Sequence, residues 1–168
     1  MKKLMIVLFA FSIALVSCKK SEEEDVYSPE KDGMVGEWQS SGSNVAILLS
    51  TYFHVDSIYA NFKENNTYVV ESFAAGVKVT YTGIYTQTKP TTGTIWTIKL
   101  EQNAPTAVTS EGIFEITKTG ETYTMKYEVA QTAPAIGATP PTPAAGFGST
   151  SGGALGNTNI QTFVKIGK

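Results

Sequence analysis

From residue 35 onward, hydrophobic and polar positions alternate with a period of two, which is typical of antiparallel β-strands. Thr, Tyr, Val and Ile are frequent in these runs, and turn-forming residues separate them. Gly83 interrupts the fourth run and is expected to mark a sharp bend of the sheet. Eight strands are predicted, over residues 35–41, 57–63, 67–74, 77–86, 94–102, 111–118, 121–130 and 159–166.

One segment between the first two runs breaks the alternation. Val45, Leu48, Leu49 and Tyr52 recur at the spacing of a helix, and Ser43 stands where an N-cap residue is expected. We therefore expect a short amphipathic helix here, with its apolar face against the rest of the domain.

Eight consecutive strands with mostly short turns favour an antiparallel up-and-down barrel, which leaves no sheet edge exposed. A β-sandwich of two four-stranded sheets is the alternative. In a barrel of this kind the odd-numbered connections share one rim and the even-numbered connections share the other. The helical segment, a loop over 103–110 and a long segment over 131–158 all fall at the first rim. We therefore expect one elaborated mouth and one plain end.

Alternation also assigns one face of each strand to the barrel interior, and that face carries no acid or amine. A barrel of eight strands can be filled by its own side chains or can hold one small ligand, and the sequence leaves both possibilities open. In a hollow barrel, tyrosine hydroxyls would supply a few hydrogen bonds to the ligand. The candidate ligand-binding residues are Phe62, Tyr68, Tyr81, Tyr85, Trp96, Leu100, Tyr123 and Tyr127. The other predicted interior residues are Trp38, Ile58, Val70, Val79, Ile98, Phe114, Ile116, Met125 and Val164.

The elaborated rim supplies a second group of candidates. The pattern Gln-x-Ala-Pro occurs twice, at 102–105 and 131–134, where two strands reach this rim. A proline that ends a strand accounts for the repeat without any function. The alternative is that the glutamines and the 131–158 segment fold over the mouth as a lid, because loops of this length are usually functional or disordered. The candidate mouth residues are Leu48, Tyr52, Gln102, Gln131 and Phe147.

The beginning of the chain has the layout of a secretory signal. Lys2 and Lys3 precede a mostly apolar run over 4–16, which is shorter than the roughly 20 residues that span a bilayer. The run ends in Leu-Val-Ser-Cys, which resembles the lipobox of bacterial lipoproteins, and Cys18 is the only cysteine. The resemblance implies that Cys18 is lipidated and begins the mature chain, since two or more acyl chains hold a protein stably at a membrane. The alternative is an ordinary secretory signal.

A charged stretch without apolar residues follows, including four consecutive acids at 22–25. We expect a signal peptide over 1–17, a lipidated cysteine and flexible acidic tether over 18–32, and a folded domain over 33–168. The acidic run resembles the export signals of Bacteroidota lipoproteins that are displayed on the cell surface. This resemblance implies an outer-membrane location at the cell surface, and a plain spacer on a periplasm-facing lipoprotein is the alternative.

Gly36, Glu37 and Trp38 on the first strand resemble the GxW signature of the lipocalins, a family of eight-stranded antiparallel barrels. With the leader, they make residues 33–168 similar to a lipocalin-like domain of a Bacteroidota lipoprotein. The resemblance implies that Gly36 and Trp38 close the plain end and that Lys165, near the end of the last strand, packs across the Trp38 ring as a cation. Lysine stands here in place of the family's arginine, and strict alternation in that strand would instead point its side chain outward. The other lipocalin motifs are missing.

Composition argues against several classes of protein. The 13 basic residues are all lysine and are outnumbered by 15 acids, so a nucleic-acid partner is not expected. One histidine and one cysteine are too few for most metal centres, and no cofactor is expected. His54 and Asp56 could pair as a general base and its orienting group, but no nucleophile accompanies them. We therefore expect no enzymatic activity.

Together these patterns predict a lipid-anchored envelope protein that binds a small apolar or aromatic ligand in a β-barrel. The alternative is a structural or protein-interaction module of the cell envelope with a filled barrel and an envelope protein as its partner. The membrane would be contacted through the lipid on Cys18. Because the first strand starts at the plain end, the tether would leave from there and the mouth would face away from the membrane.

Overall fold

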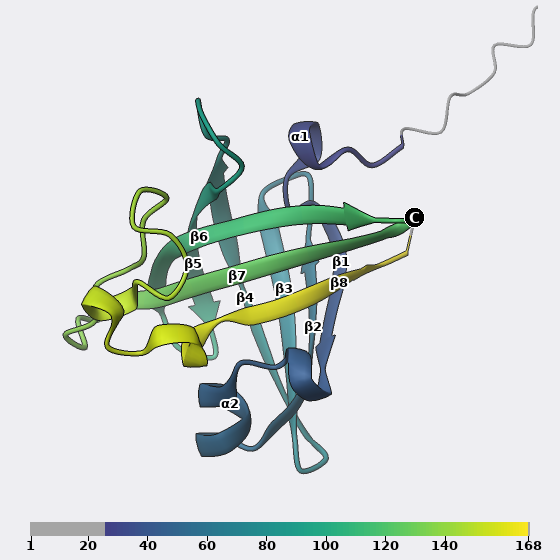
Figure 1. Cartoon of the computed structure of the whole chain (residues 1–168). Coiled ribbons are helices and arrows are strands. Elements are labelled where there is room, and N and C mark those ends of the chain that lie inside the picture. Colours follow the sequence, from purple (N-terminus) through teal and green to yellow (C-terminus); the bar gives the residue numbers. More distant parts are fainter. Residues whose placement is uncertain (1–25, 168) are drawn as a thin grey trace, which may run out of the picture.

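The structure, a computed structural model, describes residues 26–167 (Figure 1). The predicted signal peptide, Cys18 and the acidic run at 22–25 lie outside the described residues. Within the described part, eight antiparallel strands follow one another in sequence order and the last pairs with the first, so that the sheet closes on itself. The predicted up-and-down barrel is confirmed, and the sandwich alternative is wrong.

The strands match the predicted runs closely. They are β1 (Gly36–Ser41), β2 (Val55–Phe62), β3 (Thr67–Ala74), β4 (Val77–Thr88), β5 (Trp96–Ala104), β6 (Val108–Thr119), β7 (Thr122–Ala133) and β8 (Gln161–Ile166). The helices are α1 (Pro29–Asp32) and α2 (Ile47–Tyr52), with short 3-10 turns η1 (Gly42–Asn44), η2 (Thr150–Gly153) and η3 (Gly156–Asn159). None of the helices between residues 26 and 167 has the length and apolar character needed to cross a bilayer.

The two rims of the barrel differ as expected. Helix α2 with η1, and residues 134–160 with η2 and η3, connect strands at the same rim, and α2 contacts η3 (Figure 1). The predicted loop over 103–110 is wrong, however. Glu101 pairs with Thr109 and Gln102 with Val108, so the ladder between β5 and β6 runs on until only residues 105–107 remain for the turn.

Two glycines inside strands allow neighbouring backbones to approach closely. A Cβ atom added to Gly83 would lie 2.2 Å from the Glu101 carbonyl oxygen, and one added to Gly112 would lie 2.0 Å from the Glu128 carbonyl oxygen. The pairing of β4 with β5 also shifts register between Thr82 and Gly83. No other residue type fits at these positions, because a side chain would collide with backbone atoms.

The sequence-based assignment of the interior face of β8 is wrong by one residue. Gln161 and Phe163 are buried, whereas Val164 is only half-buried. A polar residue can occupy the inner face here because the Gln161 side chain donates to the Ser40 hydroxyl and accepts the Ala46 N–H at 2.8 Å. Val79 is also wrong as a core residue, since it remains 39% exposed where the β3–β4 hairpin extends past the rest of the barrel (Figure 1).

Residues before Gly36 pack beneath the plain end of the barrel. The Tyr27 ring meets Trp38 edge-on at 6.2 Å and Tyr123 edge-on at 4.9 Å between ring centroids. The Trp38 indole N–H donates to the Met34 carbonyl at 2.7 Å, and both side chains are fully buried. Part of the segment predicted as a flexible tether over 18–32 is therefore folded, because Tyr27 buries its ring against the core. The packed domain begins at about Tyr27 rather than at residue 33.

Candidate functional site

The barrel interior is divided into a packed half and a hollow half. At the plain end, large buried side chains pack against one another, and the Phe62 ring meets Tyr85 at 5.2 Å and Tyr68 at 6.1 Å between ring centroids. The Tyr85 hydroxyl donates to the Lys63 carbonyl at 2.9 Å, which fixes this layer. The buried residues of the packed half include Trp38, Phe62, Tyr85, Ile98, Phe114, Met125 and Phe163.

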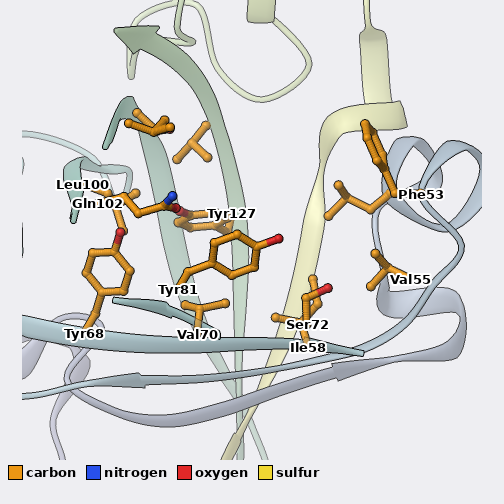
Figure 2. Close-up of a pocket in the computed structure, with 14 residues that line it drawn as sticks. Phe53, Val55, Ile58, Tyr68, Val70, Ser72, Tyr81, Leu100, Gln102 and Tyr127 are labelled. Atoms are coloured by element: carbon orange, nitrogen blue, oxygen red, sulfur yellow. The ribbon is translucent and has the colours of Figure 1, made fainter. Parts of the chain in front are cut away.

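The mouth half contains an open cavity of about 370 Å³ (Figure 2). Strands β2 to β7 each contribute to its wall, and the residues at the end of α2 border its outer side. Most of the lining is aliphatic or aromatic. The lining residues are Leu49, Phe53, Val55, Ile58, Tyr68, Val70, Ser72, Tyr81, Leu100, Gln102, Val108, Ser110, Tyr127 and Val129.

The polar groups of the cavity are uncharged. Among the lining residues there is no acid, lysine or histidine, so the site offers no counter-ion for a charged ligand. Burial raises the pKa of the Tyr68 hydroxyl to about 12. Burial, together with the neighbouring Tyr68, raises the pKa of Tyr127 further still. Both hydroxyls therefore stay protonated at neutral pH and act as hydrogen-bond donors.

The predicted ligand-binding residues divide between the two halves. Tyr68, Tyr81, Leu100 and Tyr127 line the cavity. Phe62 and Tyr85 belong to the packed layer beneath it. Trp96 and Tyr123 lie at the plain end, where they border a groove beside α1. Alternation identified the inner face of these strands but carried no information about height along the barrel.

The predicted mouth residues also divide. Gln102 lines the cavity, and its side-chain N–H donates to the Thr106 carbonyl at 2.7 Å. Gln131 donates in the same way to the Pro134 carbonyl at 2.7 Å but is not part of the lining. Both Ala–Pro bonds of the repeated sequence are cis. Each glutamine therefore holds its own strand-ending turn, and the two side chains do not fold over the mouth together.

Helix α2 is shorter than predicted and presents different residues. It begins at Ile47, with Ala46 in the N-cap position in place of the predicted Ser43, because η1 takes up the preceding turn. Leu48 and Tyr52 do not line the cavity, and Tyr52 is 73% exposed. Their neighbours Leu49 and Phe53 form the lining instead. Sequence reasoning missed Phe53 because it follows the last helical residue and has no periodic signal.

The long connection before β8 lies on the outer wall of the barrel. Lys126 Nζ lies 4.4 Å from the centre of the Phe147 ring, and residues 140–143 border a groove with Thr86, Lys99 and Glu111. No residue of 134–160 is among those that line the cavity. The prediction of Phe147 as a mouth residue is therefore wrong, and so is the lid interpretation. The segment packs against outward-facing side chains of β5 to β7 instead of covering the mouth.

Glu128 holds that segment in place. Its carboxylate is fully buried on the outer side of β7 and accepts hydrogen bonds from the Gly148 N–H at 2.6 Å and the Thr150 N–H at 3.1 Å. The Thr150 hydroxyl donates to it as well. Asn159 donates to the Val129 carbonyl at 2.9 Å. These contacts give a buried acid the partners that it needs.

The residues of the GxW resemblance come together at the plain end. Lys165 Nζ lies 5.5 Å from the centre of the Trp38 ring and 4.3 Å from that of Tyr27, so the outward orientation is wrong. A Cβ at Gly36, where φ is +117°, would lie 2.3 Å from Lys165 Nζ, which explains the glycine. Burial lowers the pKa of Lys165, partly offset by the charges of Glu37 and Asp32.

Asp56, the predicted orienting group for His54, is bound to another part of the chain. Asp56 Oδ2 accepts the Ala75 N–H at 2.9 Å and so fixes the β3–β4 turn. In the part of the chain that the structure describes, no three side chains of the metal-binding types gather in one place.

Comparison with known proteins gave no match to this chain, whether with family models, curated proteins or solved structures.

Proposed function

We propose that the protein binds a small, uncharged, apolar or aromatic molecule in the mouth half of the barrel and performs no chemistry on it. The observation that carries this proposal is the cavity of about 370 Å³, which falls within the roughly 300–1,000 Å³ of small-molecule sites. Its lining is mainly apolar, with a few tyrosine hydroxyls. The rigid, packed layer below it supports a preformed site, so that binding needs little reordering of the chain.

The test is to fill the cavity from one strand while leaving the barrel intact. Val70 lines the cavity, and Val69 precedes it on β3 with its side chain on the opposite face. We expect Val70→Trp to weaken binding of N-phenyl-1-naphthylamine at least about tenfold, because its indole occupies the ligand's space. Val69→Trp adds the same fluorophore outside the barrel and should bind the probe as the unchanged protein does. Circular dichroism shows whether both variants keep the sheet.

Two results would contradict the proposal. The first is that no neutral apolar probe binds the unchanged protein below high micromolar concentrations. The second is equal binding by the Val70→Trp and Val69→Trp variants, since the probe would then sit elsewhere.

A second candidate function is an interaction module of the cell envelope. It is favoured by apolar side chains that stand exposed at the mouth on α2 and the β3–β4 hairpin, since such clusters commonly mark contact sites. The exposed residues are Ile47, Tyr52, Phe53 and Val77. A photo-crosslinking amino acid at position 53 would capture an envelope protein in intact cells under this candidate. Absence of any crosslink, with probe binding intact, would exclude it.

We further propose that the protein is an outer-membrane lipoprotein anchored through Cys18, which a Cys18→Ser variant tests. The support comes from the Leu-Val-Ser-Cys sequence and the acidic run that follows it. The chain reaches the barrel at its plain end, where Tyr27 packs on Trp38. An anchor before that point would direct the mouth away from the membrane surface, toward ligands or partners on the far side.

A further inference from the structure

Three tyrosine hydroxyls open into the cavity without a protein acceptor. Tyr68, Tyr81 and Tyr127 all belong to the lining, and none of them forms a hydrogen bond with another residue of the described chain. In the same part of the structure, every fully buried side-chain polar atom has a partner, so these hydroxyls face open space. Tyr85, one layer below, donates to the Lys63 carbonyl. The tyrosine hydroxyl in the packed half therefore has a protein acceptor, whereas the three in the cavity can donate hydrogen bonds to a bound molecule.

Two of these hydroxyls belong to the inner end of the cavity. Tyr68 is the second residue of β3 after the turn at the plain end, and its ring packs on Phe62 of the core. The Tyr127 ring meets the buried Phe163 edge-on at 5.9 Å. Both side chains line the same cavity, and Tyr68 contributes, after burial, to the raised pKa of Tyr127.

The opposite end of the cavity is mainly apolar, with Ser72 as its one hydroxyl on the side of α2 and β2. Leu49, Phe53 and Val55 border it where α2 joins β2. Figure 2 shows Phe53, Val55 and Ser72 on one side of the pocket and Tyr68 on the other. The cavity therefore has a direction, with two tyrosine hydroxyls at its inner end and, apart from Ser72, hydrocarbon where α2 joins β2.

A ligand that fills the cavity shuts water out from the two inner hydroxyls. A pure hydrocarbon leaves both donors unpaired, and one stranded hydroxyl weakens binding by roughly tenfold to a hundredfold. A ligand oxygen that accepts from them removes this loss. A carboxylate would also accept, but it would enter a cavity with no cation to pair with it, which is unfavourable.

We infer that the ligand is an uncharged molecule with a carbonyl oxygen at one end and an apolar body, and that it enters carbonyl first, so that Tyr68 and Tyr127 donate to the oxygen. This inference rests on the proposed function and specifies the ligand class of the same cavity. Leu49 and Phe53 then cover the apolar body at the mouth.

Three probes of nearly equal size test the inference: 2-acetylnaphthalene, 2-isopropylnaphthalene and 2-naphthoate. Their dissociation constants are measured by displacement of N-phenyl-1-naphthylamine from the purified full chain at neutral pH. We expect the ketone to bind at least about tenfold more tightly than either the hydrocarbon or the carboxylate. In a Tyr68→Phe/Tyr127→Phe variant the ketone should weaken toward the hydrocarbon, while hydrocarbon binding is kept. Tyr52→Phe, exposed outside the cavity, should leave the preference unchanged.

The outcomes separate this inference from the proposed function. If the hydrocarbon binds as tightly as the ketone, or the double variant keeps the preference, the inference is overturned while the cavity remains a binding site. If the naphthoate binds as tightly as the ketone, the ligand is not restricted to uncharged molecules and the inference is again overturned. If no probe binds, both fail together. The comparison of probes on the unchanged protein needs no variant, so the test holds even where the double variant does not fold.

Discussion

Replacing Glu128 by glutamine tests how the long connection between β7 and β8 is held. The carboxylate is fully buried, receives hydrogen bonds from Gly148 and Thr150, and donates none. Hydrogen bonds to a charged acceptor contribute roughly 1.5–3 kcal/mol each, and those between neutral groups about 0.5–1.5 kcal/mol. The glutamine amide offers one acceptor and one donor, and the donor would face a backbone N–H that is itself a donor. One backbone amide is thus left without a partner and the remaining bonds are weakened.

We expect Glu128→Gln to lower the free energy of unfolding by about 2–4 kcal/mol. Urea denaturation followed by tryptophan fluorescence measures this change. Native-state hydrogen exchange locates it, because the amides of Gly148 and Thr150 should exchange faster while those in the β5–β6 ladder keep their protection. The matched control is Glu121→Gln, whose side chain is 99% exposed and which should stay within about 0.5 kcal/mol of the unchanged protein.

Equal stability of the two variants, with Gly148 and Thr150 amides that exchange at their original rates, would rule out this role of the carboxylate. Such a result would mean that the Pro-rich part of the segment and Phe147 hold it without the carboxylate.

Two further predictions concern pH and location. Burial raises the pKa of Tyr68 and Tyr85 from the reference value of 10.0 to about 12, so the folded state keeps protons that the unfolded chain loses. The free energy of unfolding should be constant below about pH 10 and fall as the pH rises toward 12, by less than about 1.4 kcal/mol per pH unit for each tyrosine, because solvent screens the partly open hydroxyls. Tyr68→Phe should flatten this slope in urea titrations, and a slope that stays the same would contradict the assignment to Tyr68. Cys18→Ser should move the protein from the detergent-extracted membrane fraction to the soluble fraction, and an unchanged distribution would contradict lipidation of that residue.

The strand order could be predicted because, in nearly every strand, the alternation of apolar and polar residues identifies the face that points into the barrel. Alternation failed at β8, where a polar residue, Gln161, occupies an inner position. Its hydrogen-bond partners are Ser40 and Ala46, more than a hundred residues away, so no local pattern in the sequence indicates them. The inward position of Lys165 follows from the same shift, because it lies two residues beyond Phe163 on that face.

The candidate site was less accessible to sequence reasoning. Whether a barrel interior is filled depends on how side chains from six strands meet at one height, and this is not encoded in any one run. Tyr81 and Tyr85 share a face of β4, yet the first lines the cavity and the second belongs to the packed layer. From the sequence alone Glu128 is indistinguishable from a surface acid, because the first backbone amide that binds its carboxylate comes 20 residues later in the chain.

The entry of the chain beneath the plain end has a practical consequence. Tyr27 and Met34 are built into the base of the barrel, and the cavity opens at the other rim. A biotin tag, dye or fused domain joined ahead of Val26 would therefore sit remote from the opening. Molecules captured on a sensor chip through such a tag would all present the opening to the flowing sample, so that immobilisation leaves the measured on-rates unaltered.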